Sequence, residues 1–109
     1  MGKIYISNQL EFERWNKKEL EENVFKYIEY KNNCLEISSI DEKIGKCSKI
    51  IFYNVFKFDI DNQHINSDSF DIIKELKFIC IKKNHINITF ILKNNVKICI
   101  DCQKIIIIN

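Results

Sequence analysis

The most regular hydrophobic pattern lies in the C-terminal part of the chain. Residues 78–83, 86–92 and 96–102 are apolar runs rich in β-branched side chains, which favour strands. Two short polar segments, Asn84-His85 and residues 93–95, separate these runs. The pattern predicts a three-stranded antiparallel meander.

The register of this meander follows if its apolar residues share one face, because a slip of one residue turns a strand over. A two-residue turn at Asn84 and His85 meets this condition, together with a three-residue loop in which Asn95 is left-handed. The expected pairs are Ile79 with Phe90, Ile81 with Ile88, Phe90 with Ile98, and Ile88 with Ile100.

The opposite face of the meander is then predicted to carry three cross-strand rows. These rows are Phe78, Ile91 and Lys97; Cys80, Thr89 and Cys99; and Lys82, Asn87 and Asp101. The core does not need the polar groups of this face, so we predict that Lys82, Asn87, Asp101 and Lys97 contact a partner. The alternative is an ordinary surface, either solvated or covered by the N-terminal elements.

Two helices are expected upstream of the meander. Asp68 or Ser69 can cap a helix that runs to about Lys77. Its apolar stripe, at helical spacing, comprises Phe70, Ile72, Ile73 and Leu76. A second, short helix is expected near residues 16–22, which open with a segment resembling a capping box. Leu20, Val24 and Ile28 recur there at a spacing that fits helix and strand alike.

The middle of the chain predicts strands. Residues 49–60 form the longest candidate, with apolar side chains on both faces, as in a central strand. Asn54 interrupts one of these faces and indicates a bulge, or else a buried amide with hydrogen-bond partners. Before it, residues 24–31 and 34–39 predict a hairpin around Asn32 and Asn33. This hairpin pairs Tyr30 with Leu35 and Ile28 with Ile37.

The four isoleucines at 105–108 are expected to form a largely buried strand. Burial of each such side chain is worth about 1.5–3 kcal/mol, which the chain would lose by leaving the run in water. If the run were exposed in the monomer, a homodimer through this edge would be the better account.

These elements predict an α+β fold in a single domain of residues 1–109. An antiparallel sheet, made of the hairpin, the long central strand and the C-terminal three-stranded meander, packs against one or two helices. The length of 109 residues suits one core, and 46% apolar with 29% charged residues is a globular composition.

The charge and residue usage say little about partners. Ile, Lys and Asn are abundant, Ala and Pro are absent, and Arg14 is the only arginine, which indicates a low-GC genome. The net charge is only +2, without a basic block, so a nucleic-acid partner is not expected. We expect a cytoplasmic protein that does not contact a membrane, because the sequence shows neither a signal peptide nor a long apolar segment.

No motif points to catalysis, a cofactor or a metal. Phosphate-cradling loops need glycines at fixed offsets, and the chain has two isolated glycines. Cys99 and Cys102 have CxxC spacing, but in a strand residues three apart point to opposite faces. Cys80 and His85 could be a nucleophile and a base, although a histidine at a hairpin tip is usually a solvated turn residue. We therefore expect no enzyme, and five reduced thiols.

The order of the elements resembles that of small immunity proteins from bacterial toxin loci. The likeness lies in the hairpin of residues 24–39, the aromatic strand at 50–56, a short helix and a closing meander. It implies a non-enzymatic protein that blocks a cognate toxin. The leading expectation is thus a non-enzymatic protein-binding module, such as an immunity or inhibitor protein. The alternative is a small nucleic-acid-binding or regulatory domain.

Overall fold

Almost all elements of the chain are strands. The computed structural model describes residues 3–15, 20–61 and 72–108. Its elements are β1 (Lys3–Ile6), α1 (Gln9–Arg14), β2 (Val24–Lys31), β3 (Cys34–Asp41), β4 (Lys46–Tyr53), β5 (Lys57–Asp61), β6 (Ile73–Lys82), β7 (His85–Leu92), β8 (Lys97–Cys102) and β9 (Lys104–Ile108).

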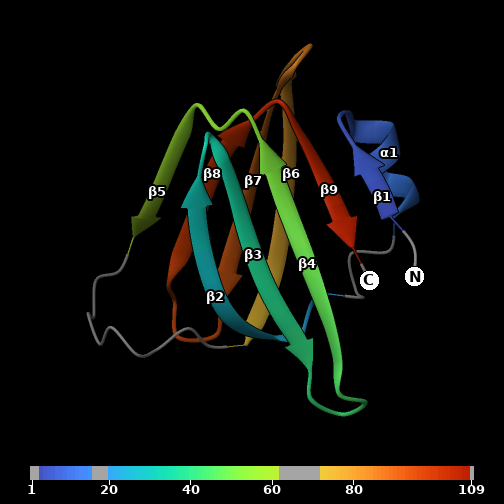
Figure 1. Cartoon of the computed structure of the whole chain (residues 1–109), viewed down its shortest axis with the longest axis vertical. Helices are drawn as coiled ribbons and strands as arrows, with labels where there is room; N and C mark the ends of the chain where they lie inside the picture. Colours follow the sequence, from blue (N-terminus) through green and yellow to red (C-terminus); the bar gives the residue numbers. More distant parts are fainter. Residues whose placement is uncertain (1–2, 16–19, 62–71, 109) are drawn as a thin grey trace.

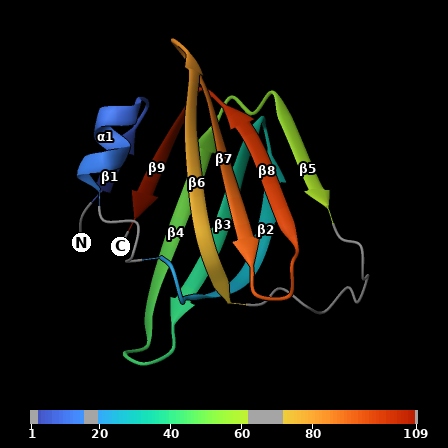
Figure 2. The same ribbon diagram turned by 180° about the vertical axis from the view of Figure 1, so that it is seen from behind.

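The strands form two antiparallel sheets that face each other (Figure 1, Figure 2). The order is β1-β9-β4-β3-β2 in the five-stranded sheet and β5-β8-β7-β6 in the four-stranded sheet. Each sheet turns its apolar side chains toward the other, as in a β-sandwich. Phe25, Phe52 and Phe90 meet between the sheets, with ring centroids 6.1 Å apart from Phe90 to each of the other two.

The α+β prediction is therefore wrong, and the chief error is the helix expected up to Lys77. Residues 73–77 belong to strand β6, while its expected start at 68–71 lies outside the described residues. A bulge between Ile73 and Glu75 adds one residue to the strand. Ile73 and Leu76 consequently both point into the core, where they are 0% and 1% exposed, although they are three residues apart. The bulge thus imitates helical spacing.

The long strand predicted at 49–60 is also wrong, because it is two strands in different sheets. Asn54, with φ of 52°, turns the chain from β4 in one sheet to β5 in the other. The left-handed conformation suits asparagine better than most residues. The Asn54 side-chain amide donates a hydrogen bond to Gln103, which sits where β8 crosses back to β9. Both crossings between the sheets therefore lie at one corner.

The helix expected near residues 16–22 falls partly outside the described residues, which omit 16–19. Leu20 to Glu22 form a turn, and the described helix, α1, lies earlier. Asn8 caps α1 by accepting a hydrogen bond from the Glu11 amide at 2.9 Å. The Phe12 ring stacks on Phe78 with centroids 4.6 Å apart, so α1 packs beside β1 and β6 and covers one side of the sandwich (Figure 2).

Two predictions for the strands are confirmed. In the hairpin of β2 and β3, Tyr30 pairs with Leu35 and Ile28 with Ile37. The run at 105–108 is β9, a strand between β1 and β4 in which Ile105, Ile106 and Ile107 are 0%, 8% and 1% exposed. Because both edges of β9 are paired, the homodimer suggested for an exposed run has no basis at this strand.

The meander exists as β6, β7 and β8, but its predicted register is right only for the second pair of strands. Phe90 pairs with Ile98 and Ile88 with Ile100, and Asn95 is left-handed with φ of 67°. On the first pair, Ile88 faces Phe78 and Phe90 faces Leu76. The turn is at Lys83 and Asn84, one residue earlier than predicted, and a further bulge lies between Cys80 and Lys82. Together they shift the pairing of β6 with β7 by three residues. Because this number is odd, the opposite face of β6 points to the core, and Ile79 and Ile81 are exposed.

Candidate functional site

The outer face of the four-stranded sheet carries the predicted contact residues in a changed arrangement. Asn87 pairs with Asp101 on β8, and Lys57 of β5 and Ile79 of β6 complete the row. Lys82, predicted for this row, pairs instead with His85, because β6 is shifted. Lys97 lies two rows away opposite Ile91, as predicted, with Asp61 of β5 on its other side. The structure thus keeps Asn87, Asp101 and Lys97 in their predicted rows and moves Lys82 out of its predicted row.

A hydrogen-bonded network occupies the centre of this row. The Asp101 carboxylate accepts a bond from the Asn87 side-chain amide, and its other oxygen lies 3.0 Å from His85 Nε2. Thr89 Oγ1 donates a hydrogen bond to the side-chain oxygen Oδ1 of Asn87 at 3.0 Å. The His85 and Asp101 side chains are only 25% and 18% exposed, so the network is held in a fixed geometry before any partner binds.

Three exposed apolar side chains surround the network. Phe56, Ile79 and Ile81 are 62%, 58% and 51% exposed. The Phe56 ring meets the His85 ring edge to face, with centroids 5.4 Å apart. We call these residues and their polar centre the His85 patch; it consists of Phe56, Lys57, Ile79, Ile81, His85, Asn87 and Asp101.

Sequence reasoning missed Phe56 and His85 as members of this patch. The sequence pattern predicts Phe56 in the interior of the strand 49–60, and the left-handed preference of Asn54 is the signal that indicates an end of this strand before Phe56. The same pattern predicts His85 in the turn. The structure places it at the start of β7, two residues before Asn87 and therefore on the same face.

The pKa of Asp101 lies below that of an ordinary aspartate. Burial, the largest single influence, raises this pKa. The hydrogen bonds from Asn87 and His85, with the charges of His85 and Lys57, together lower it by more. The folded protein therefore favours the carboxylate form.

Replacing Asp101 with asparagine should lower the free energy of unfolding at pH 7 by about 0.5–1.5 kcal/mol, the usual worth of such hydrogen bonds. Because the pKa of Asp101 is lowered in the folded protein, its contribution to the free energy of unfolding is fully present above the ordinary aspartate pKa of about 4. This contribution is lost as the pH falls further. Urea unfolding at pH 7 and in acid should show the parent and Asp101→Asn converging in acid. Asp59→Asn, one row away on β5, is the control; a gap that persists in acid would contradict the assignment.

The geometry offers little for catalysis or metal binding. The two thiols of the CxxC segment point apart as expected: Cys102 is buried, whereas Cys99 lies on the outer face near Thr89. Burial, with the Asp101 charge, raises the pKa of Cys102 to about 12, so its thiol is protonated. The predicted nucleophile and base are also not paired, because His85 contacts Asp101 and the thiol of Cys80 donates a hydrogen bond to the main-chain carbonyl of Lys82. In the described residues, no group of three His, Cys, Asp or Glu side chains could hold a metal.

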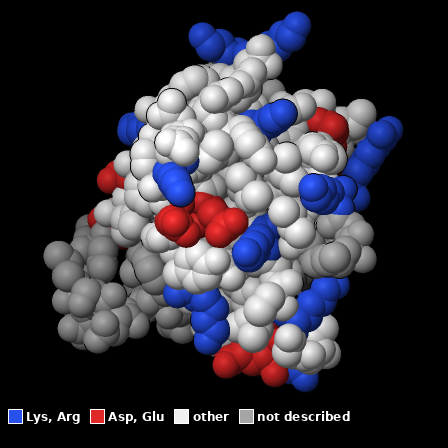
Figure 3. Space-filling view, in the orientation of Figure 1, with Lys and Arg blue, Asp and Glu red and all other residues white. Residues whose placement is uncertain are grey.

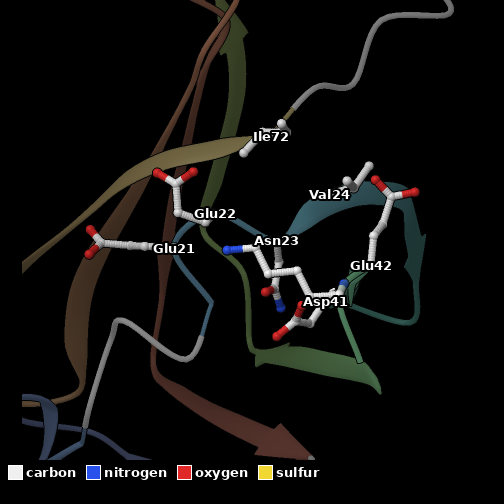
Figure 4. Close-up of a pocket in the computed structure, with 8 residues that line it drawn as sticks. Glu21, Glu22, Asn23, Val24, Asp41, Glu42 and Ile72 are labelled. Atoms are coloured by element: carbon white, nitrogen blue, oxygen red, sulfur yellow. Dashed lines mark hydrogen bonds between the residues drawn. The ribbon is translucent and has the colours of Figure 1, made fainter. Parts of the chain in front are cut away.

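A pocket of about 510 Å³ lies at the opposite end of the sandwich, and it is acidic. Glu21, Glu22, Asp41 and Glu42 line it, but Figure 4 shows their carboxylates pointing in different directions. Three of them already have partners: Glu21 accepts from the Leu76 amide, Glu22 pairs with Lys93, and Asp41 accepts from the Lys43 amide. The carboxylates stabilise turns and do not converge on a cation.

The outer face of the five-stranded sheet, toward the viewer in Figure 3, shows no continuous basic area. Lysines are scattered over it among acidic and uncharged residues. Near its β2 edge, Glu29 and Glu36 are directly opposite on β2 and β3. This face does not have the charge that binding to a nucleic-acid backbone requires.

Known proteins do not supply a function for this surface. Among the described residues, no helix has the length and apolar character needed to cross a membrane. Comparison of the chain with protein-family models, with curated proteins and with solved structures finds no match.

Proposed function

We propose that this protein is a non-enzymatic protein-binding module and that it binds its partner through the His85 patch. The observation that carries the proposal is the combination of three exposed apolar side chains with a preorganised polar centre. Protein interfaces concentrate their binding energy in a few such anchors, with aromatic side chains prominent among them.

The patch suits a protein partner better than a small ligand. Phe56 directly precedes β5, and the other residues come from β5, β6, β7 and β8, so the patch spans the width of the sheet. In its central row, Lys57 stands at one side and Ile79 at the other, with Asn87 and Asp101 between them. A partner that covers both sides would remove apolar area from water while meeting hydrogen-bonding groups that are already oriented.

An inhibitor role, as in an immunity protein that blocks a bacterial toxin in the cytoplasm, is part of this proposal. Such a protein needs only a rigid binding surface, which a sandwich provides. The layout that suggested this class included a helix before the meander, and β6 takes its place from Ile73 onward. The proposal therefore rests on the surface and not on the layout.

Capture of the partner from the native host, with identification by mass spectrometry, tests the proposal. Phe56→Ala should lose the protein that the parent captures, because truncating an interface anchor costs about 2 kcal/mol or more of binding. Its melting temperature should be nearly unchanged, since Phe56 is exposed. The matched control is Leu10→Ala on α1, where the side chain is 56% exposed. Equal capture by Phe56→Ala, or recovery of nucleic acid alone, would refute the proposal.

A further inference from the structure

We propose that the open edge of β6, around Cys80, accepts an extended, acidic segment of the partner as an additional strand of the four-stranded sheet. This inference rests on the proposed protein-binding function and specifies how the partner is held. Addition of a strand to a free sheet edge uses main-chain hydrogen bonds for affinity and side chains for specificity.

The first half of the β6 edge is already covered by the chain itself. Ile73 donates to the Asn23 carbonyl at 2.8 Å and accepts from the Glu22 amide at 2.7 Å. The Leu76 amide donates to the Glu21 carboxylate at 3.2 Å. The side chain of Phe78 then stacks on Phe12 of α1. The fold thus protects this edge from Ile73 to about Phe78, as natural sheets usually do.

The second half lacks this protection. The amide of Leu76 points away from β7, and in a strand the direction of the peptide groups alternates, so the groups of Phe78 and Cys80 also point outward. Within the part of the chain that the structure describes, no hydrogen bond satisfies the outward peptide groups of Cys80. Figure 2 shows this end of β6, with the turn to β7, rising beyond the neighbouring strands.

The side chains along this edge indicate the chemistry of the added strand. Lys77, Lys82 and Lys83 are all exposed, and neither of the ion pairs among the described residues involves them. Between them, Ile79 and Ile81 are exposed apolar groups that belong to the His85 patch. Lys77 pairs with Thr89 and Lys82 with His85, so both lysines lie on the outer face, whereas Phe78 and Cys80 pair with the buried Ile88 and Ile86 of the inner face. A strand that alternates acidic and apolar side chains would therefore set its acidic groups beside the lysines and its apolar groups beside Phe78 and Cys80.

The same lysines disfavour a second copy of this chain as the occupant. Antiparallel pairing of two β6 edges centred on Cys80 would set Lys77 of each copy opposite Lys83 of the other. Like charges directly opposite in a sheet are destabilising. Lysines on a free edge are a common protection against self-association, and here they leave an acidic strand as the favoured occupant.

The probe for this proposal is a synthetic, capped peptide of alternating glutamate and valine, with a lysine-valine peptide as its counterpart. Titration into the full-length, isotope-labelled protein under reducing conditions should shift the amide signals of residues 78–82 and slow hydrogen exchange at the Cys80 amide. The lysine-valine peptide should not bind. Equal binding of the two peptides, no binding of the acidic one, or shifts confined to other strands would overturn the proposal.

Variants distinguish binding at the β6 edge from binding at the His85 patch. Cys80→Pro removes the outward amide and should abolish peptide binding, whereas Cys80→Ala keeps it and should bind like the parent. Lys82→Glu with Lys83→Glu should weaken binding by about tenfold or more, which tests the charge requirement even if the proline variant unfolds. Phe56→Ala should bind the peptide normally. If Cys80→Pro folds and still captures the native partner that Phe56→Ala loses, the edge proposal fails and the proposed function stands.

Discussion

Replacing Phe90 with alanine is expected to lower the free energy of unfolding by about 3–5 kcal/mol, the usual cost of removing a buried phenylalanine. Phe90 is 0% exposed and lies at the centre of the sandwich, where it contacts Phe25 and Phe52 of the opposite sheet. Its loss would leave a cavity that two rigid sheets cannot close. A domain of this size has only about 5–15 kcal/mol of stability, so the change is severe.

Urea unfolding followed by tryptophan fluorescence and circular dichroism measures this effect. The matched control is Phe56→Ala, which removes the same side chain from an exposed position and should change stability by less than about 0.5 kcal/mol. Equal destabilisation by the two variants would show that Phe90 does not join the two sheets as described.

Removal of residues 105–109 is expected to prevent folding altogether. The deletion takes out nearly all of β9, which pairs with β1 on one side and β4 on the other. It would leave β1 without a partner strand and expose the inner face that Ile105 and Ile107 cover, at 0% and 1% exposure. Each buried isoleucine is worth about 1.5–3 kcal/mol, and the ladders on both sides of the strand are lost as well.

Size-exclusion chromatography and thermal melting of the truncated chain provide the test. We expect an aggregated or unfolded product without a cooperative transition. Lys104→Ala, an exposed substitution in the same strand, should behave like the parent and so serves as the control. A soluble truncated chain that melts like the parent would contradict the central place of β9.

The fold class could not be predicted correctly because a bulge gives part of β6 the spacing of a helix. The bulge after Ile73 lets Ile73 and Leu76 both face the core. A similar bulge in β2 lets Phe25 and Ile28 both face the core, but there the pairing around Asn32 and Asn33 still identifies a hairpin. Residues three apart on one buried face are the usual mark of a helix, and sequence periodicity alone does not separate the two cases.

The candidate site was half predictable for a related reason. The loop between β7 and β8 has a length that determines its register, so the pairing of Asn87 with Asp101 followed correctly from the sequence. The pairing of β6 with β7 could not be predicted from the sequence in the same way. Lys83-Asn84 and Asn84-His85 are similar candidates for the turn, and the bulge near Ile81 has no sequence signal. The turn and the bulge together shift the pairing by three residues, which moves Lys82 out of the row and exposes Ile79.

The position of β9 also has a consequence for synthesis on the ribosome. β1 is made first and β9 last among the described strands, yet β9 is the strand that joins β1 to β4. A nascent chain that already contains β1 to β8 still has a five-stranded sheet divided in two, with apolar positions of β4 exposed at the gap. The hairpins can form during translation, but closure of the core waits for the last isoleucines, and until then the chain depends on its surroundings to avoid aggregation.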